Sequence, residues 1–132
     1  MEQVITNVKD IANAYITEVL SGSDTGMLTE NDFTSMSTDH QPTALIRVED
    51  DAPIYALMDQ AIETLKLHVT DPIPAMIVSI AYGAEHEIGF EELMPLHERI
   101  DLLANKQTQL VWDMQAKEDL KCKRSVLVFV FQ

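Results

Sequence analysis

The side chains best suited to chemistry in this sequence are those of Glu85-His86-Glu87, with Glu91 and Glu92 close behind. Carboxylate oxygens and imidazole nitrogens are common metal ligands. Zinc sites, however, prefer ligands spaced at a turn or a helical repeat, as in H-x-x-x-H, and adjacent residues of a loop rarely converge on one ion. The sequence therefore predicts a solvated acidic loop here and no metal site.

A nucleophilic site is also hard to assemble from the sequence. The single cysteine, Cys122, has Lys121 and Lys123 beside it but no neighbouring histidine or acid that could act as its base. The chain lacks the G-x-S-x-G, C-x-x-C and H-E-x-x-H patterns of hydrolases, redox proteins and zinc peptidases. We therefore expect no catalytic residue, no bound cofactor and no enzymatic activity.

The charge of the chain limits its partners. It has 22 acidic and 9 basic residues, which give a formal net charge of −13. Nucleic acids and anionic membranes repel such a surface, and the one locally basic stretch, residues 117–124, is typical of a hairpin loop. The sequence has no apolar run of about 18 residues, and its first residues do not resemble a signal peptide. We expect a cytoplasmic protein that binds neither nucleic acid nor membrane.

The elements that must position these residues follow from the spacing of apolar side chains. Val4, Val8, Ile11, Tyr15 and Val19 recur at helical intervals, which predicts a helix over about residues 2–20 that the glycines of 21–26 end. A connector over 27–42 follows, in which residues 30–37 favour a short helix. Beyond it the pattern predicts strands over 43–48, 75–82, 109–114 and 125–131, and helices over 54–68 and 90–103.

This order predicts an α/β (α+β) fold, in which an N-terminal helix is followed by β-α-β-α-β-β. We expect a mixed four-stranded sheet with helices packed on it and the last two strands joined as an antiparallel hairpin. The run 75–82 is the most apolar of the chain and predicts a central strand. With 132 residues, the chain has the length of one compact unit, which divides into a helix and connector over 1–42 and an α/β domain over 43–132.

Four local patterns, taken in this order, carry a resemblance to a known family. They are an apolar strand over 76–83 that ends in Gly83, an acidic helix start over 90–93, the strand QLVWD over 109–113, and a last apolar strand over 126–131 that ends in Phe131. In this order they resemble the C-terminal domain of the FtsZ/tubulin family over residues 43–131. Residues 26–36 are similar to the loop after the family's central helix, which residues 2–20 would then form.

The departures from the family pattern bear on function. FtsZ and tubulin bind GTP through a glycine-rich loop, whereas this chain has four glycines and no such cluster, so we expect no GTP binding. The family's loop also places an Asn-x-Asp-x-x-Asp pattern in a neighbouring subunit's nucleotide site. With Asp32 as the anchor, Glu30 stands at the Asn position and Ser35 at the last Asp. The resemblance implies a partner-contacting loop at these three residues without hydrolysis; the alternative is that Asp32 caps a short helix.

Two functions remain open. The resemblance implies a non-catalytic interaction module that binds or modulates a cytoplasmic filament or another protein, through its first helix or an exposed sheet edge. A homodimer, a partner subunit, or packing of helix 2–20 on its own sheet would each cover that helix. The other function rests on a similar element order in trimeric chorismate mutases, which bind small acids in clefts between subunits. Such a site needs convergent arginines, and the chain has Arg47, Arg99 and Arg124.

Overall fold

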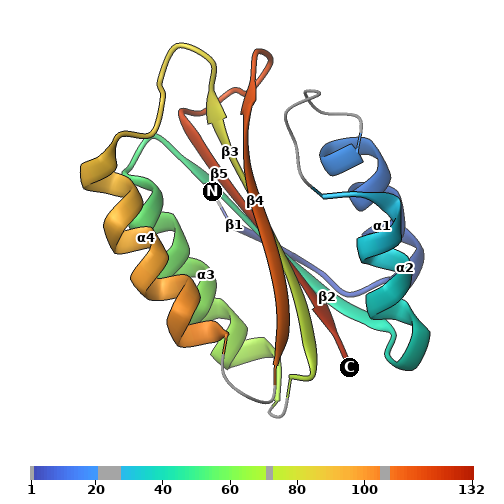
Figure 1. The fold of residues 1–132 in the computed structure, drawn as a ribbon. Coiled ribbons are helices and arrows are strands. Elements are labelled where there is room, and N and C mark those ends of the chain that lie inside the picture. The colour runs from blue at the N-terminus through green and yellow to red at the C-terminus, as the bar shows by residue number, and fades with distance from the viewer. Residues whose placement is uncertain (1, 21–27, 71–72, 105–107) are drawn as a thin grey trace.

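The computed structural model describes residues 2–20, 28–70, 73–104 and 108–132, and these form three layers, with helices on both faces of one sheet (Figure 1). In chain order the elements are β1 (Glu2–Ile5), α1 (Val8–Ala14), the π-helix η1 (Tyr15–Leu20), α2 (Glu30–Asp39), β2 (Pro42–Asp50), α3 (Ile54–His68), β3 (Ala75–Gly83), α4 (Phe90–Leu103), β4 (Gln109–Lys117) and β5 (Arg124–Phe131).

The sheet has five strands in the order β1-β2-β5-β3-β4. β3 and β4 are parallel, and every other neighbouring pair is antiparallel. β5 lies in the middle, and all eight of its residues are buried. A strand in this position is covered on both faces and therefore has apolar side chains at consecutive positions.

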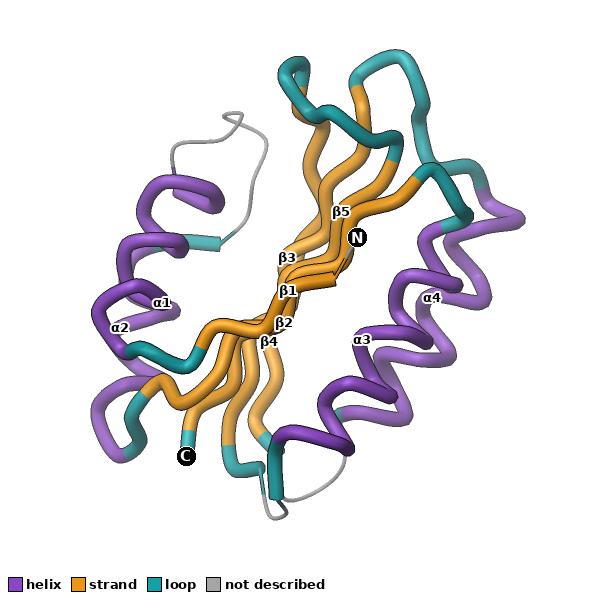
Figure 2. The backbone as a smooth tube through the Cα atoms, turned by 180° about the vertical axis from the view of Figure 1, so that it is seen from behind, coloured by secondary structure: helices purple, strands orange, loops and turns teal. Residues whose placement is uncertain are grey.

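Each face of the sheet has its own core (Figure 2). Alternate residues of a strand point to opposite faces, so Val128 of β5 packs under α3 and α4, whereas Phe129 packs under α1 and α2. On the second face, the ring of Tyr15 meets those of Phe33 and Phe129 at centroid distances of 4.7 and 5.3 Å. The first helix therefore packs on the chain's own sheet, one of the three ways of covering it that the sequence left open.

The prediction of one helix over 2–20 is wrong at its start. Residues 2–5 form β1, which pairs antiparallel with β2, and the helix begins at Val8. Asn7 is its N-cap, because its side-chain oxygen accepts the backbone N–H of Lys9 at 2.9 Å and of Asp10 at 3.3 Å. The sheet consequently has five strands and not the four expected.

The predicted hairpin between the last two strands is also wrong. β5 pairs with β2 on one side and β3 on the other, so β3 separates β5 from β4. The physical reason is burial: β5 is apolar on both faces and is stabilised most in the centre of the sheet. The more polar β4 takes the edge instead.

Most other elements lie where the sequence predicts them. Helices 54–68 and 90–103 have the predicted bounds, and the short helix expected within 30–37 is the longer α2. The predicted strands are present and are extended by a few residues at their ends, most of all β4, which reaches Lys117. Among the described residues, no helix has both the length and the apolar character needed to cross a membrane.

Candidate functional site

One end of the sheet gathers the loops that follow three strands running in the same direction. β2 and β3 are both antiparallel to β5, and β3 is parallel to β4, so β2, β3 and β4 end together. In open, mostly parallel α/β sheets, ligands bind beyond the carboxyl ends of the strands, and the parallel pair β3 and β4 places such an end here. A pocket of about 490 Å³ lies here, lined by residues of 51–53, 86–87 and 123–124 and by the first turns of α3 and α4.

Arg124 is the most buried charged group in this pocket, with 10% of its side chain exposed. Its Nε and Nη2 atoms each donate to the carboxylate of Glu92 at 2.9 Å. Its Nη1 donates to the backbone oxygens of His86 and Lys123, and Nη2 reaches the backbone oxygen of Glu87 at 3.5 Å. The five donors of the guanidinium are therefore used within the protein, and they fix the loop after β3 to the start of β5.

Glu92 joins the two helices that begin at this pocket. Besides binding Arg124, its Oε1 atom accepts the backbone N–H of Ile54 at 2.6 Å. This bond caps α3, whose own N-cap residue, Pro53, makes no side-chain cap. The Arg124 hydrogen bond lowers the pKa of Glu92, against the opposing effect of burial, and the Ile54 N–H lowers it further. The carboxylate is therefore a fixed structural anion.

The remaining arginines are also bound to carboxylates. Arg47 forms a two-bond ion pair with Glu18 of η1, and Arg99 forms one with Asp59 of α3, at 2.7 and 3.1 Å. With Arg124 on Glu92, each of the three arginines of the sequence has a carboxylate partner. A small acid that binds the paired edge of a guanidinium would have to displace one of these carboxylates.

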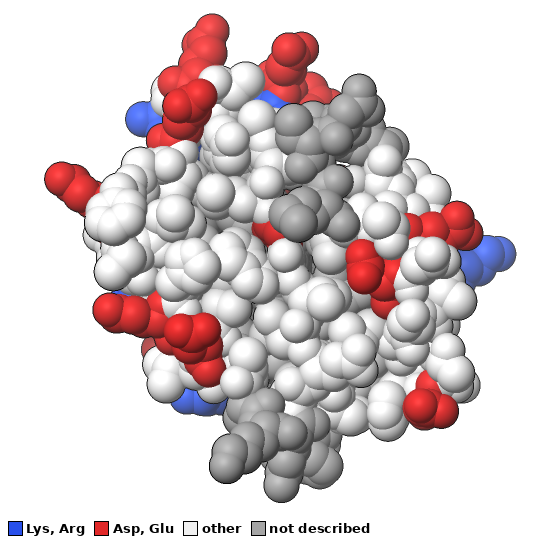
Figure 3. Space-filling view, in the orientation of Figure 1, with Lys and Arg blue, Asp and Glu red and all other residues white. Residues whose placement is uncertain are grey.

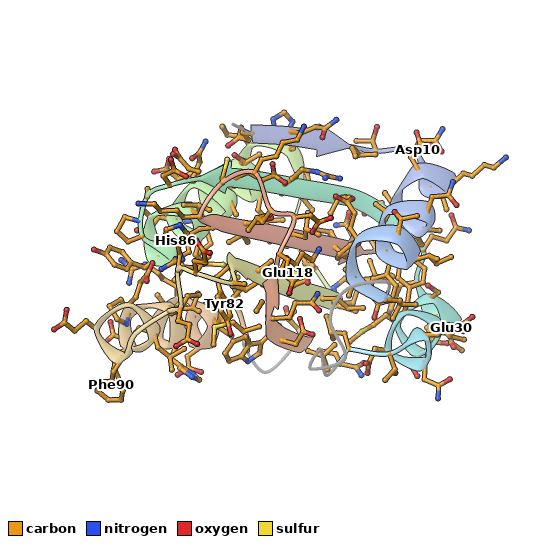
Figure 4. The ribbon with its side chains drawn as sticks, turned by 90° about the horizontal axis from the view of Figure 1, so that it is seen from above. Asp10, Glu30, Tyr82, His86, Phe90 and Glu118 are labelled. Atoms are coloured by element: carbon orange, nitrogen blue, oxygen red, sulfur yellow. The ribbon has the colours of Figure 1, made fainter. Side chains whose placement is uncertain are left out.

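The loop residues that the sequence singled out lie on the opposite side of the sheet from this pocket. Glu30, Asp32 and Ser35 belong to α2, and Figure 4 places Glu30 far from Tyr82 and His86. Asp32 forms a capping box with Thr29, whose backbone N–H it accepts at 2.8 Å. Glu30 and Ser35 are exposed and can be reached by a partner. The part of the predicted loop before Leu28 lies outside the described residues.

The acidic loop at 85–87 is held mainly through its backbone. A turn closes it, with the N–H of His86 donating to the carbonyl of Gly83 at 2.8 Å, and Arg124 binds the carbonyl of His86. The described part of the chain contains no group of three histidine, cysteine, aspartate or glutamate side chains placed to hold a metal ion. Cys122 is a half-buried thiol in the turn between β4 and β5.

The outer edge of β4 is a second candidate site, one for a macromolecule. β4 is the last strand of the sheet, and its nine residues pair with β3 without a register shift. Natural edge strands are usually short or carry proline, a bulge or an outward lysine, which prevent another strand from pairing with them. Before Lys117, its last residue, β4 has no proline, bulge or lysine, and its one charged residue, Asp113, is buried and accepts the backbone N–H of Leu28. The opposite edge strand, β1, has only four residues.

The hydrogen bonds at both ends of β4 define which backbone groups are open. Gln109 donates its N–H to the carbonyl of Pro74 at 2.9 Å, and the carbonyl of Lys117 accepts the N–H of Ala84 at 3.2 Å. In a parallel ladder, alternate residues turn both backbone groups to the same neighbour, so the odd-numbered residues of β4 face β3. The groups of the even-numbered residues, Leu110, Trp112, Met114 and Ala116, point outward, where no described segment pairs with them.

A stripe of α4 lies beside this edge. The ring of His97 packs edge-on against Trp112 of β4, with centroids 5.1 Å apart and planes at 84°. Phe90, Met94 and Asp101 lie on the same side of α4 as His97, at intervals of about one helical turn. Phe90 and Met94 are 74% and 49% exposed, and Figure 4 shows Phe90 pointing away from the body of the protein. We name these four residues the α4 flank.

Comparison with known proteins adds no assignment: no protein-family model and no curated protein sequence matches this chain. The fold and the site define the class of the protein, a mixed α/β domain with an edge strand, β4, that no described segment pairs with on its outer side, and a pocket in which Arg124 is bound to Glu92. Its function is therefore argued from these features.

Proposed function

We propose that the protein is a non-catalytic interaction module that binds an extended segment of another protein along the open edge of β4. The observation that carries this proposal is the row of outward N–H and C=O groups at Leu110, Trp112, Met114 and Ala116. An added strand would satisfy these groups through main-chain hydrogen bonds, which is how several peptide-binding domains recognise their targets.

The most buried charged pair of the pocket, Glu92 with Arg124, supports a role without catalysis. A general acid or base needs a group that is free to exchange a proton with a substrate. Glu92 and Arg124 instead bind each other and the backbone of the surrounding loops. Asp51 likewise accepts the backbone N–H of Lys123 at 2.9 Å. These polar contacts hold the loops in place, so the pocket supports the fold at the helix starts.

The finer proposal is that this module is related to the C-terminal domain of the FtsZ/tubulin family and acts on a filament. Its support is the order of the elements from 43 to 131 and the position of α2 after a preceding helix. Co-sedimentation with GTP-assembled FtsZ filaments tests it. We expect the protein to pellet with the filaments or to change their amount, with no GTP turnover of its own. If it does neither, the filament proposal is wrong and binding to another protein remains.

A proline at Ala116 tests the binding edge. Proline lacks the N–H, and at this position it removes an outward donor and leaves the bonds to β3 intact. The matched control is Ala116→Val, which keeps the N–H and adds a similar bulk. Extended peptides selected from a random library on the wild-type protein should bind the valine variant normally and bind Ala116→Pro about tenfold more weakly. If selection yields no peptide whose binding depends on this N–H, the proposed function is wrong.

A further inference from the structure

The geometry of α4 and β4 points to the chemistry of the partner: a strand that presents apolar side chains to Phe90 and Met94 and a lysine or arginine to Asp101. This inference rests on the proposed function, because it assumes that a strand adds to β4, and it specifies what that strand carries. Its first basis is the way α4 and β4 run alongside each other.

α4 connects β3 to the parallel strand β4, so it runs antiparallel to β4 (Figure 1). The contact between His97 and Trp112 fixes the alignment of the two elements. One helical turn advances about 5.4 Å, and two strand residues advance about 6.6 Å. Successive residues of the α4 flank therefore have nearly the same spacing as the even-numbered residues of β4. Asp101 lies nearest Leu110, and Met94 and Phe90 lie toward Met114 and Ala116.

This alignment determines which side chains of an added strand meet the flank. Side chains of neighbouring strands stand side by side on the same face of a sheet. Every second residue of the partner would thus project on the α4 side, one for each residue of the flank. Phe90 and Met94 offer exposed apolar surface to two of them, and the burial of that surface favours apolar residues there.

The charges around the edge favour a basic residue at the position that meets Asp101. Asp101 is exposed at one end of the flank, and Glu118 and Asp119 are exposed in the turn after β4, at the other end. Figure 3 shows the face that carries the β4 edge: apart from the grey atoms, its centre is mostly uncharged, and acidic side chains with fewer basic ones lie around it. Lys117, the lysine of β4, donates to the backbone oxygen of Glu18 and is thereby held within the protein.

The same charges favour a segment of another protein over a second copy of this chain. Two copies paired through β4 would bring together two surfaces of the same sign, each on a chain with a net charge of −13. A segment with lysine or arginine is attracted to this edge. A concentration-dependent dimer that Ala116→Pro abolishes would overturn this choice of occupant.

The experiment uses fluorescent peptides of the same length as β4, with threonine at alternate positions. The positions between the threonines carry leucines and one lysine. The lysine takes the first of these positions in one peptide and the last of them in the other, because the direction of the added strand determines which end meets Asp101. We expect one of the two to bind at least about tenfold more tightly than a peptide with the same residues in shuffled order. Its binding should weaken about tenfold in Ala116→Pro and be unchanged in Ala116→Val.

Reversal of one charge separates the partner chemistry from the strand addition. In Asp101→Lys, which changes an exposed residue, preference should switch to the peptide that carries glutamate in place of lysine. If Asp101→Lys still prefers the lysine peptide, the proposed partner chemistry is wrong and the proposed function stands. The same holds if library peptides depend on the Ala116 N–H but carry an acidic or uncharged residue opposite Asp101. If the lysine peptide binds Ala116→Pro as tightly as the wild-type protein, charge attracts it without strand addition. That result would overturn both the partner chemistry and the proposed function.

Discussion

Arg124 donates two hydrogen bonds of 2.9 Å to the carboxylate of Glu92, and this ion pair joins the first residue of β5 to the first turn of α4. The same carboxylate caps α3 through the N–H of Ile54. The three elements that surround the pocket therefore depend on one acidic side chain, of which 15% is exposed. Loss of its charge leaves a nearly buried guanidinium uncompensated.

Glu92→Gln should lower the free energy of unfolding by about 2–3 kcal/mol at neutral pH, because it removes the charge that Arg124 binds. Urea unfolding of the two proteins measures this difference. The pKa of Glu92 lies below its ordinary value of 4.5 in the folded protein, so its contribution is complete above that pH and is lost as the pH falls through the lower folded pKa. The difference between the two proteins should therefore shrink in acid.

The control for this prediction is Glu91→Gln. Glu91 is the exposed neighbour of Glu92 and lines the same pocket, so its loss should change the unfolding free energy by less than about 0.5 kcal/mol. Equal effects of the two substitutions would mean that general repulsion among the acids, and not the ion pair, sets the stability here.

Tyr15→Phe tests the core under α1 and α2. The hydroxyl of Tyr15 donates to the carbonyl of Thr29 at 2.7 Å, and its loss should cost about 1 kcal/mol at neutral pH. Burial raises the pKa of Tyr15 well above its ordinary value of 10.0, and the carboxylates of Asp32 and Asp113 raise it further. A raised pKa gives stability that is complete below the unfolded pKa and is lost as the pH rises toward the folded one.

The wild-type protein should therefore lose stability above about pH 10, and Tyr15→Phe should lack this part of the loss. Denaturant unfolding at neutral and alkaline pH measures both, and tyrosinate absorbance should show one tyrosine that ionises only when the protein unfolds. Tyr82→Phe is the control and should keep the alkaline loss. If all the tyrosines ionise in the folded protein, the prediction is wrong.

The sequence predicts α3, α4 and β3 well because each has a strong local signal, either helical spacing or an unbroken apolar run. β1 is different: Val4 continues the helical spacing of Val8 and Ile11, so its apolar pattern fits a helix as well as a strand. The signal that separates β1 from the helix is Asn7, a favoured N-cap residue before a periodic run.

Strand order and the candidate sites depend on partners distant in the sequence. Arg124 and Glu92 are 32 positions apart, and no local pattern links them. The outer edge of β4 can be recognised only when β5 is known to lie between β2 and β3. The predicted pairing of β5 with β4 would instead occupy that edge. The apolar residues on both faces of β5 were the available sign of its central place.

Gln115→Met should stabilise the protein. Gln115 is 1% exposed on β4, and among the described residues neither its Nε2 nor its Oε1 atom has a hydrogen-bond partner. Burial of an amide without partners is unfavourable, and methionine has a similar shape without that cost, so the unfolding free energy should rise by about 1–2 kcal/mol. Gln109→Met, at the exposed start of the same strand, should change it by less than about 0.5 kcal/mol. A loss of stability in Gln115→Met would mean that the amide is satisfied in solution.

Substitutions in α2 separate the two interpretations of the loop that the family resemblance singled out. Asp32→Ala removes the capping box with Thr29 and should lower the unfolding free energy by about 1 kcal/mol. Ser35→Ala and Glu30→Ala change exposed side chains and should leave stability within about 0.5 kcal/mol. Denaturant unfolding and filament co-sedimentation are measured on the same three variants. If Asp32 only caps the helix, stability falls in Asp32→Ala alone and co-sedimentation follows the folded fraction. If the loop contacts a filament, Glu30→Ala or Ser35→Ala reduces co-sedimentation with no loss of stability, because their side chains would be lost from the contact and not from the fold.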